Sequence, residues 1–270
     1  MNDSPIGVFD SGMGGLTVMR ALMARLPDER FIYLGDTARL PYGTKSADTV
    51  SRYAVQAAGA LMKRRVKLVV VACNTASAVA LPALEAALAP IPVIGVVEPG
   101  AEAAVAAAPR GPIAVIATEG TVRDGAYLRA IQQRAPGIRI VQRACPLFVP
   151  LAEEGLVEGE IAELIAHRYL DSLLADAPAA LVLGCTHFPV LANTIARVAG
   201  SKVALVDSAA TTADAVTNLL SERGLARKSA SLEPHRFLAT DAPERFARVG
   251  AIFLGRPISE GEIQLIDLQT

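Results

Sequence analysis

The sequence predicts an α/β fold of two pseudo-symmetric lobes, each a mostly parallel sheet flanked by helices, with the functional site in the cleft between them. Short β-branched runs alternate with longer helical segments along the 270 residues. Because these runs are apolar on both faces, they are typical of parallel strands covered by helices. Two parts of the chain also carry similar strand-to-helix turns, which favours duplication over coincidence between two ordinary halves. We expect residues 1–97 and 208–270 to form one lobe and residues 98–207 the other.

Apolar periodicity places the individual elements. The expected strands are residues 6–9, 31–34, 68–71, 93–96, 113–116, 138–141, 181–183, 203–206 and 237–238. The clearest helical segments are residues 16–25, 47–65, 76–88, 125–134 and 160–174. In parallel sheets of this kind, ligands bind beyond the carboxyl ends of the strands, so the turns that follow the strands are the places to look for chemistry.

Composition narrows the class of partner. The formal net charge is −1, which gives no reason to expect nucleic acid or a membrane surface as a partner. The first residues lack a secretory-signal pattern, and no apolar run approaches the ~20 residues that span a bilayer. The three cysteines are an odd, scattered number, which disfavours a disulfide framework and predicts a cytoplasmic protein.

Two of the cysteines occupy matching turns. Cys73 and Cys185 each follow an apolar strand and a small residue, and each precedes polar residues that open a helix. Amide groups and the dipole at a helix N-terminus favour a thiolate, so both cysteines are candidate reactive groups. Cys145 has no polar support nearby and fits a small buried hydrophobic residue instead.

Two separated thiols restrict the possible chemistry. A redox pair would have close spacing. Zinc would need three or four ligands, and the three histidines form no ligand pattern with the cysteines. A hydrolytic enzyme would need only one nucleophile. Inversion of a stereocentre needs one acid–base group on each face of a planar carbanion. Two lobes that each present one cysteine to a shared cleft meet that requirement.

A glycine-rich turn follows the first strand at residues 10–17 (DSGMGGLT), and Asp36 follows the second strand. This arrangement imitates a dinucleotide fingerprint, so a nucleotide-binding or regulatory protein is the alternative hypothesis. The third glycine of that fingerprint is absent. We therefore expect the backbone amides and Ser11 to face a small anion, which leaves Asp10 to hold a substrate ammonium group or to assist a thiol. The loop around Tyr42 and Gly43 fits a surface turn or a ligand-binding loop equally well.

Taken together, several segments resemble the glutamate racemases of the aspartate/glutamate racemase superfamily. The resemblance runs in family order from near the first residue to about residue 210. Its segments are GVFDSGMGGL (7–16), GDTARLPYG (35–43), ACNTAS (72–77), ATEGTV (117–122), CPLFVPL (145–151) and LGCTHFP (183–189).

The resemblance implies a cytoplasmic homodimer that interconverts L- and D-glutamate without pyridoxal phosphate, metal or another cofactor, and so supplies D-glutamate for peptidoglycan synthesis. A racemase for aspartate or a broader set of acidic amino acids is a variant of this hypothesis. Activation by a peptidoglycan precursor is not expected, because the first strand begins near residue 5 without the extension that some members carry. The implied catalytic residues are the acid–base pair Cys73 and Cys185 with the helpers Asp10, His187 and Glu153, beside which Glu154 offers a second acid. The implied substrate contacts are Asp10, Ser11, Tyr42, Gly43, Asn74, Thr75, Thr118, Thr121, Thr186 and His187.

Overall fold

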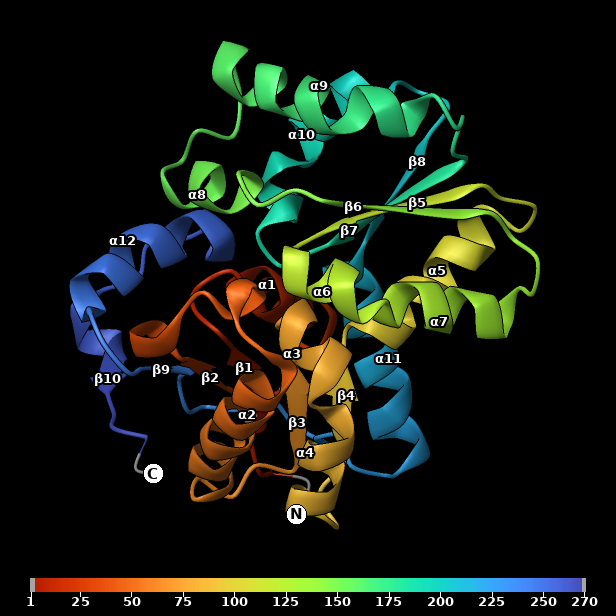
Figure 1. Cartoon of the computed structure of the whole chain (residues 1–270). Coiled ribbons are helices and arrows are strands. Elements are labelled where there is room, and N and C mark those ends of the chain that lie inside the picture. The colour runs from red at the N-terminus through yellow and green to blue at the C-terminus, as the bar shows by residue number, and fades with distance from the viewer. Residues whose placement is uncertain (1–2, 269–270) are drawn as a thin grey trace.

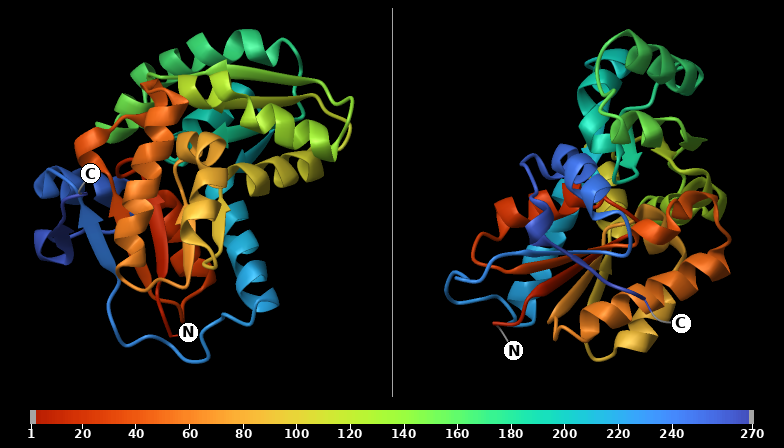
Figure 2. Two further views of the ribbon diagram at one scale, coloured as in Figure 1. Left: turned by 60° about the horizontal axis from the view of Figure 1, so that its bottom comes forward. Right: turned by 90° about the vertical axis from the view of Figure 1, so that its left-hand side faces the viewer.

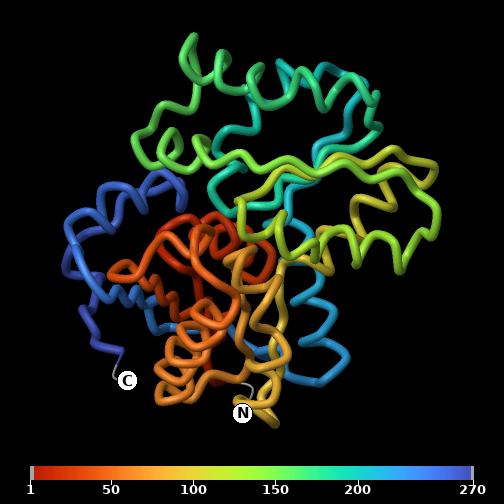
Figure 3. The backbone as a smooth tube through the Cα atoms, in the orientation of Figure 1, coloured from red at the N-terminus to blue at the C-terminus, as the bar shows by residue number. Residues whose placement is uncertain are grey.

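A computed structural model of the chain describes residues 3–268. Two parallel sheets lie in two lobes that stack end to end (Figure 1). The chain builds most of the first lobe, crosses to the second after residue 95, where the next helix already packs on the second sheet, and returns near residue 207 to complete the first (Figure 3). The predicted fold class is therefore confirmed.

The two sheets share one strand order. The first has the order β10-β9-β2-β1-β3-β4, and the second has the order β6-β5-β7-β8. In chain order within each lobe, both contain the arrangement second-first-third-fourth, and β9 and β10 extend the first sheet beyond β2. The strands are β1 (Ile6–Asp10), β2 (Phe31–Gly35), β3 (Leu68–Val71), β4 (Val93–Gly95), β5 (Ile113–Ala117), β6 (Ile140–Ala144), β7 (Ala180–Gly184), β8 (Ala204–Asp207), β9 (Arg236–Ala239) and β10 (Ile263–Leu265).

Helices cover both faces of each sheet (Figure 2). The α-helices are α1 (Leu16–Arg25), α2 (Ala47–Met62), α3 (Asn74–Val79), α4 (Leu81–Leu88), α5 (Val97–Ala107), α6 (Glu119–Asp124), α7 (Ala126–Arg134), α8 (Phe148–Glu153), α9 (Glu160–Leu174), α10 (Ala192–Ala199), α11 (Ser208–Glu222) and α12 (Pro243–Leu254). Short 3-10 turns lie at η1 (Thr37–Arg39), η2 (Tyr42–Thr44), η3 (Phe188–Leu191) and η4 (Glu260–Glu262).

Burial on both strand faces explains why the strands read as continuous apolar runs. Val8 packs into a core beneath α1, α11 and α12, whereas its neighbour Phe9 packs into a core beneath α2 and α4. The first of these cores continues into the second lobe, where it includes Leu183 and Phe188. The lobes therefore share one apolar core. The lobe boundaries at residues 97/98 and 207/208 remain a prediction.

Several boundaries differ from the sequence prediction. The helix expected over residues 76–88 is two helices, α3 and α4, because Pro82 lacks an amide hydrogen and its ring cannot follow an unbroken helical turn. The break falls at Ala80. The expected strand 93–96 ends at Gly95, and α5 begins at Val97. The sequence analysis did not identify this helix, because its many alanines show no clear helical pattern of apolar residues. No helix within residues 3–268 is long and apolar enough to cross a membrane.

Candidate active site

A small cavity lies between the carboxyl ends of the two sheets. The third strand of each lobe, β3 or β7, ends one or two residues before a cysteine, so Cys73 and Cys185 reach this cavity from opposite lobes. Each cysteine is about 5% exposed. The cavity measures about 40 Å³, and its lining consists of Ser11, Pro41, Tyr42, Gly43, Cys73, Asn74, Thr75, Thr118, Val149, Cys185, Thr186 and His187.

Cys73 sits at the N-cap position of α3. Its Sγ donates a hydrogen bond to Ser11 Oγ at 3.5 Å. Burial and then the nearby carboxylate of Asp10 outweigh the smaller lowering by the Ser11 bond and raise the pKa of Cys73 to about 12. Cys73 is therefore a neutral thiol near pH 7, and it can donate a proton.

Cys185 has a different partner. Its Sγ lies 3.8 Å from His187 Nδ1, and the other ring nitrogen, Nε2, lies 3.2 Å from Glu153 Oε1. Arg245 from α12 donates to Glu153 Oε2 at 2.8 Å. The ring of Phe253 packs edge-on against the His187 ring, with 5.0 Å between the two ring centres. This chain of contacts holds the imidazole ring beside the sulfur.

The charged groups in this series of contacts keep His187 protonated. Burial lowers the pKa of His187, but the contacts with Cys185 and Glu153 outweigh burial and raise it to about 10. Burial likewise raises the pKa of Glu153, but bonds to His187 and Arg245 outweigh it, and the net pKa is lowered. At pH 7, His187 and Glu153 therefore form an imidazolium–carboxylate pair next to the sulfur of Cys185.

The raised pKa of His187 predicts a pH-dependent stability. A group whose pKa rises on folding stabilises the fold fully below its unfolded pKa, about 6.5, and that contribution is lost as the pH rises through about 10. The free energy of unfolding should therefore fall between pH 6.5 and pH 10, and the fall should be smaller in His187→Gln. Urea unfolding under reducing conditions measures it. The control is His167→Gln, which changes an exposed histidine; an identical pH dependence in wild type and His187→Gln would contradict the assignment.

The glycine-rich turn encloses a carboxylate that belongs to the chain itself. Gly12 N donates to Asp10 Oδ2 at 2.9 Å, and the amides of Ser11 and Gly15 also hydrogen-bond to this side chain. Asp10 therefore already bonds three amides of the turn, and contact of Ser11 with a bound anion stays a prediction. Burial raises the pKa of Asp10 although these bonds lower it. Its Oδ1 atom is buried and has no hydrogen-bond partner among residues 3–268.

Glycine at position 14 allows the two lobes to meet. A Cβ atom on Gly14 would lie 2.4 Å from His187 Nδ1 and 2.5 Å from Thr186 Oγ1. Thr17, one turn into the following helix, donates to the Thr186 carbonyl at 3.0 Å. The glycine-rich turn therefore packs directly against the turn that carries Cys185.

Hydroxyl and amide groups complete the wall of the cavity. Thr75 from the first lobe bonds Thr118 at 2.9 Å and Thr121 at 3.3 Å in the second lobe. Asn74 Nδ2 donates to the Tyr127 hydroxyl at 2.8 Å, and Asn74 Oδ1 is buried without a partner among the described residues.

The Tyr42 side chain points away from the cavity. Its hydroxyl donates a short hydrogen bond to Asp36 Oδ2, and its ring is buried against Phe9. The main chain of Tyr42 and Gly43 is therefore the part that can contact a ligand. Within residues 3–268, the amides of Tyr42 and Gly43 have no hydrogen-bond acceptor.

The structure brings the predicted site residues into one region. Ten of them line the cavity, and Asp10, Thr121 and Glu153 lie directly behind it in contact with lining residues. The sequence analysis missed Tyr127, Arg245 and Phe253, which support lining residues from α7 and α12, and it missed Pro41 and Val149, which line the cavity. Pro41 and Val149 stand within the quoted segments and could have been found there. The distant helix residues carry no local signal.

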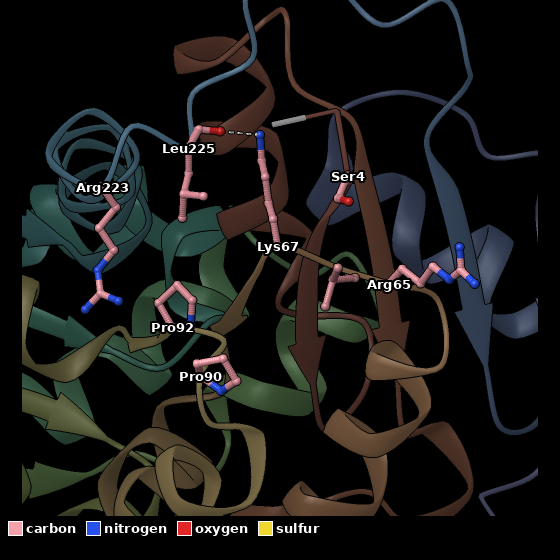
Figure 4. Close-up of a pocket in the computed structure, with 8 residues that line it drawn as sticks. Ser4, Arg65, Lys67, Pro90, Pro92, Arg223 and Leu225 are labelled. Atoms are coloured by element: carbon pink, nitrogen blue, oxygen red, sulfur yellow. Dashed lines mark hydrogen bonds between the residues drawn. The ribbon is translucent and has the colours of Figure 1, made fainter. Parts of the chain in front are cut away.

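A larger hollow of about 470 Å³ lies elsewhere, at the amino ends of the strands (Figure 4). Its lining includes Arg65, Pro90, Pro92 and Arg223, and neither reactive cysteine reaches it. Among the described residues, no group of three or more His, Cys, Asp or Glu side chains is arranged to hold a metal ion.

Comparison with known proteins gives a consistent result. The family described as Asp/Glu/Hydantoin racemase matches residues 6–216. A glutamate racemase of Geobacter metallireducens is 49% identical over 98% of this chain and 97% of its own length. The crystal structure of a glutamate racemase from Francisella tularensis in complex with D-glutamate is 38% identical, with a TM-score of 0.92 and 99% of each chain covered. A glutamate racemase from Thermus thermophilus in complex with beta-chloro-D-alanine is 44% identical, with a TM-score of 0.85 over 99% of this chain and 98% of that one.

Proposed function

Because this chain belongs to the Asp/Glu/Hydantoin racemase family, we propose that it catalyses glutamate racemisation, the interconversion of L- and D-glutamate. The observation that carries the proposal is the pair of buried cysteines, one from each lobe, in one small cavity. The resulting D-glutamate would serve peptidoglycan synthesis. A cytoplasmic location and a homodimeric state, which the family resemblance implies, remain predictions.

The two thiols divide the proton transfer between them. One sulfur, as a thiolate, removes the α-proton from its face of the substrate, and the other, as a thiol, delivers a proton to the opposite face. The reverse reaction exchanges the two roles, so each enantiomer is deprotonated by the cysteine that faces its α-hydrogen. No net proton is gained or lost by the enzyme and substrate together.

The polar neighbours allow each sulfur to serve in both roles. Asp10, whose pKa is raised by burial, lies close enough to Cys73 to act on its charge and can accept its proton. The His187 imidazolium, held by Glu153, attracts negative charge on Cys185 and can donate a proton to it. The two sides of the cavity therefore have different acid–base helpers.

The carbanion is the difficult intermediate, because an α-proton is far less acidic than a thiol. The site must stabilise enediolate-like charge on the α-carboxylate with preorganised donors. Asn74 and Thr75 at the start of α3 and the amides of Tyr42 and Gly43 are the available donors. The buried wall also excludes water, which strengthens these interactions.

Circular dichroism tests the proposal on wild-type protein purified under reducing conditions without added cofactor. We expect the signal of L-glutamate, and separately that of D-glutamate, to decay to zero as the mixture becomes racemic. L-Aspartate is the comparison substrate, and we expect it to be racemised much more slowly. No change in the glutamate signal would contradict the proposal, and equal rates for aspartate would replace it with a broader acidic-amino-acid racemase.

A further inference from the structure

We infer that Asp36 is a positioning residue, which fixes the substrate-facing main chain at residues 41–43 through the hydroxyl of Tyr42. This inference rests on the proposed function. Asp36 follows β2, is fully buried and does not line the cavity. It bonds the Tyr42 hydroxyl from behind the 41–43 segment that lines the cavity.

The Asp36 carboxylate accepts hydrogen bonds from three side chains in two parts of the first lobe, the 37–43 loop and the end of β9. Tyr42 Oη and Arg39 Nε donate to Oδ2, the latter at 2.7 Å, and Thr240 Oγ1 donates to Oδ1 at 3.1 Å. The backbone amide of Asp36 donates to the Asp10 carbonyl at 3.0 Å. The carboxylate therefore ties the 37–43 loop to the residue that follows β9, and the Asp36 amide ties this network to the strand end that carries Asp10.

Within residues 3–268, the hydroxyl of Tyr42 has no hydrogen-bond partner other than Asp36. The Tyr42 ring is 1% exposed and packs against Phe9 and Tyr53. Arg39 is itself held, because its guanidinium lies 4.1 Å from the centre of the Tyr53 ring and bonds Gln56. Across the cleft, a Cβ atom on Gly43 would lie 2.8 Å from Thr118 Cβ, so a small shift of this segment would change the cavity.

Loss of a bond that only stabilises the fold would lower the melting temperature and leave the kinetic constants unchanged. Loss of a bond that sets the position of substrate-binding amides should instead raise KM, because those amides bind both enantiomers in the ground state. A hydrogen bond to a charged partner commonly corresponds to a change of about tenfold in binding. The loss of the Tyr42 hydroxyl should therefore appear mainly in KM.

The test compares Tyr42→Phe, Asp36→Asn and the double variant with wild type in both directions of the reaction. Tyr42→Phe removes a single oxygen atom, so it tests the inference even if Asp36→Asn folds poorly. We expect each single variant to raise KM for L- and D-glutamate about tenfold and to change kcat by no more than about twofold. Because Asp36 acts through Tyr42, the double variant should raise KM little beyond the larger single change. The matched control is Tyr53→Phe, which changes the neighbouring ring and should leave KM unaltered.

A lowered melting temperature with unchanged KM in Tyr42→Phe would overturn the inference, and so would KM effects that multiply in the double variant. Calorimetric titration with D-glutamate separates these outcomes from failure of the proposed function. If wild type binds and racemises glutamate while Tyr42→Phe matches it, only the role of Asp36 is wrong. If wild type neither binds nor racemises glutamate, the proposed function fails, and this inference fails with it.

Discussion

Replacement of either Cys73 or Cys185 by serine is expected to lower kcat for glutamate racemisation by about 10³-fold. A serine hydroxyl is a much weaker acid than a thiol, so each variant loses one of the two proton-transfer groups. The remaining cysteine still faces the α-carbon from its own lobe. Each variant should therefore keep slow exchange of the α-hydrogen with solvent deuterium for one enantiomer only, and the two variants should select opposite enantiomers. Proton NMR in D2O measures this exchange.

Cys145→Ala is the matched control for these variants. Cys145 is also a fully buried thiol, and its pKa is raised to about 12 by burial, but it lies outside the cavity lining. Its replacement should leave kcat and KM near their wild-type values. Full activity in either serine variant, or loss of exchange for both enantiomers in both variants, would contradict the two-thiol assignment.

The second large effect is expected at Gly14. In Gly14→Ala the new methyl group would lie 2.4 Å from His187 Nδ1, and the ring cannot retreat because Glu153 and Phe253 hold its other side. Overpacking of this kind costs about 1–3 kcal/mol of stability. Displacement of the ring by about 1 Å from Cys185 should lower kcat/KM about 10²-fold. Urea unfolding and steady-state kinetics measure the two effects.

Gly59→Ala is the control for Gly14→Ala. Gly59 lies inside α2, and no atom stands within 4 Å of the position of its Cβ. Alanine there should raise the free energy of unfolding by about 0.5–1 kcal/mol and leave activity unchanged. Wild-type kcat/KM in Gly14→Ala would show that the contact between the lobes is not needed to place His187.

The fold and the role of the two cysteines could be predicted from sequence, because both depend on short patterns of neighbouring residues. Strands such as β1 and β3 are apolar runs, and Cys73 and Cys185 stand at equivalent strand ends in lobes with the same strand order. The strands β6 and β10 were harder to predict. The start of β6 was expected two residues too early, and β10 was missed because its residues are half-buried or exposed at the sheet edge.

The support of the site could not be predicted, because it depends on contacts between distant parts of the chain. Arg245 reaches Glu153 from a helix 92 positions away in sequence, and Tyr127 reaches Asn74 from the other lobe. The bonds inside the glycine-rich turn could not be predicted either. The amides of Ser11, Gly12 and Gly15 bond to Asp10, which is part of the same short motif, and sequence does not show which anion a turn encloses.

The central claim is that two sulfur atoms approach one α-carbon from opposite faces. A crystal structure of the wild-type protein with D-glutamate bound under reducing conditions tests it most directly. We expect the Sγ atoms of Cys73 and Cys185 to lie on opposite sides of Cα, each at about 3–4 Å. Glutamate bound outside this cavity, or bound with both sulfurs on the same side of Cα, would contradict the account.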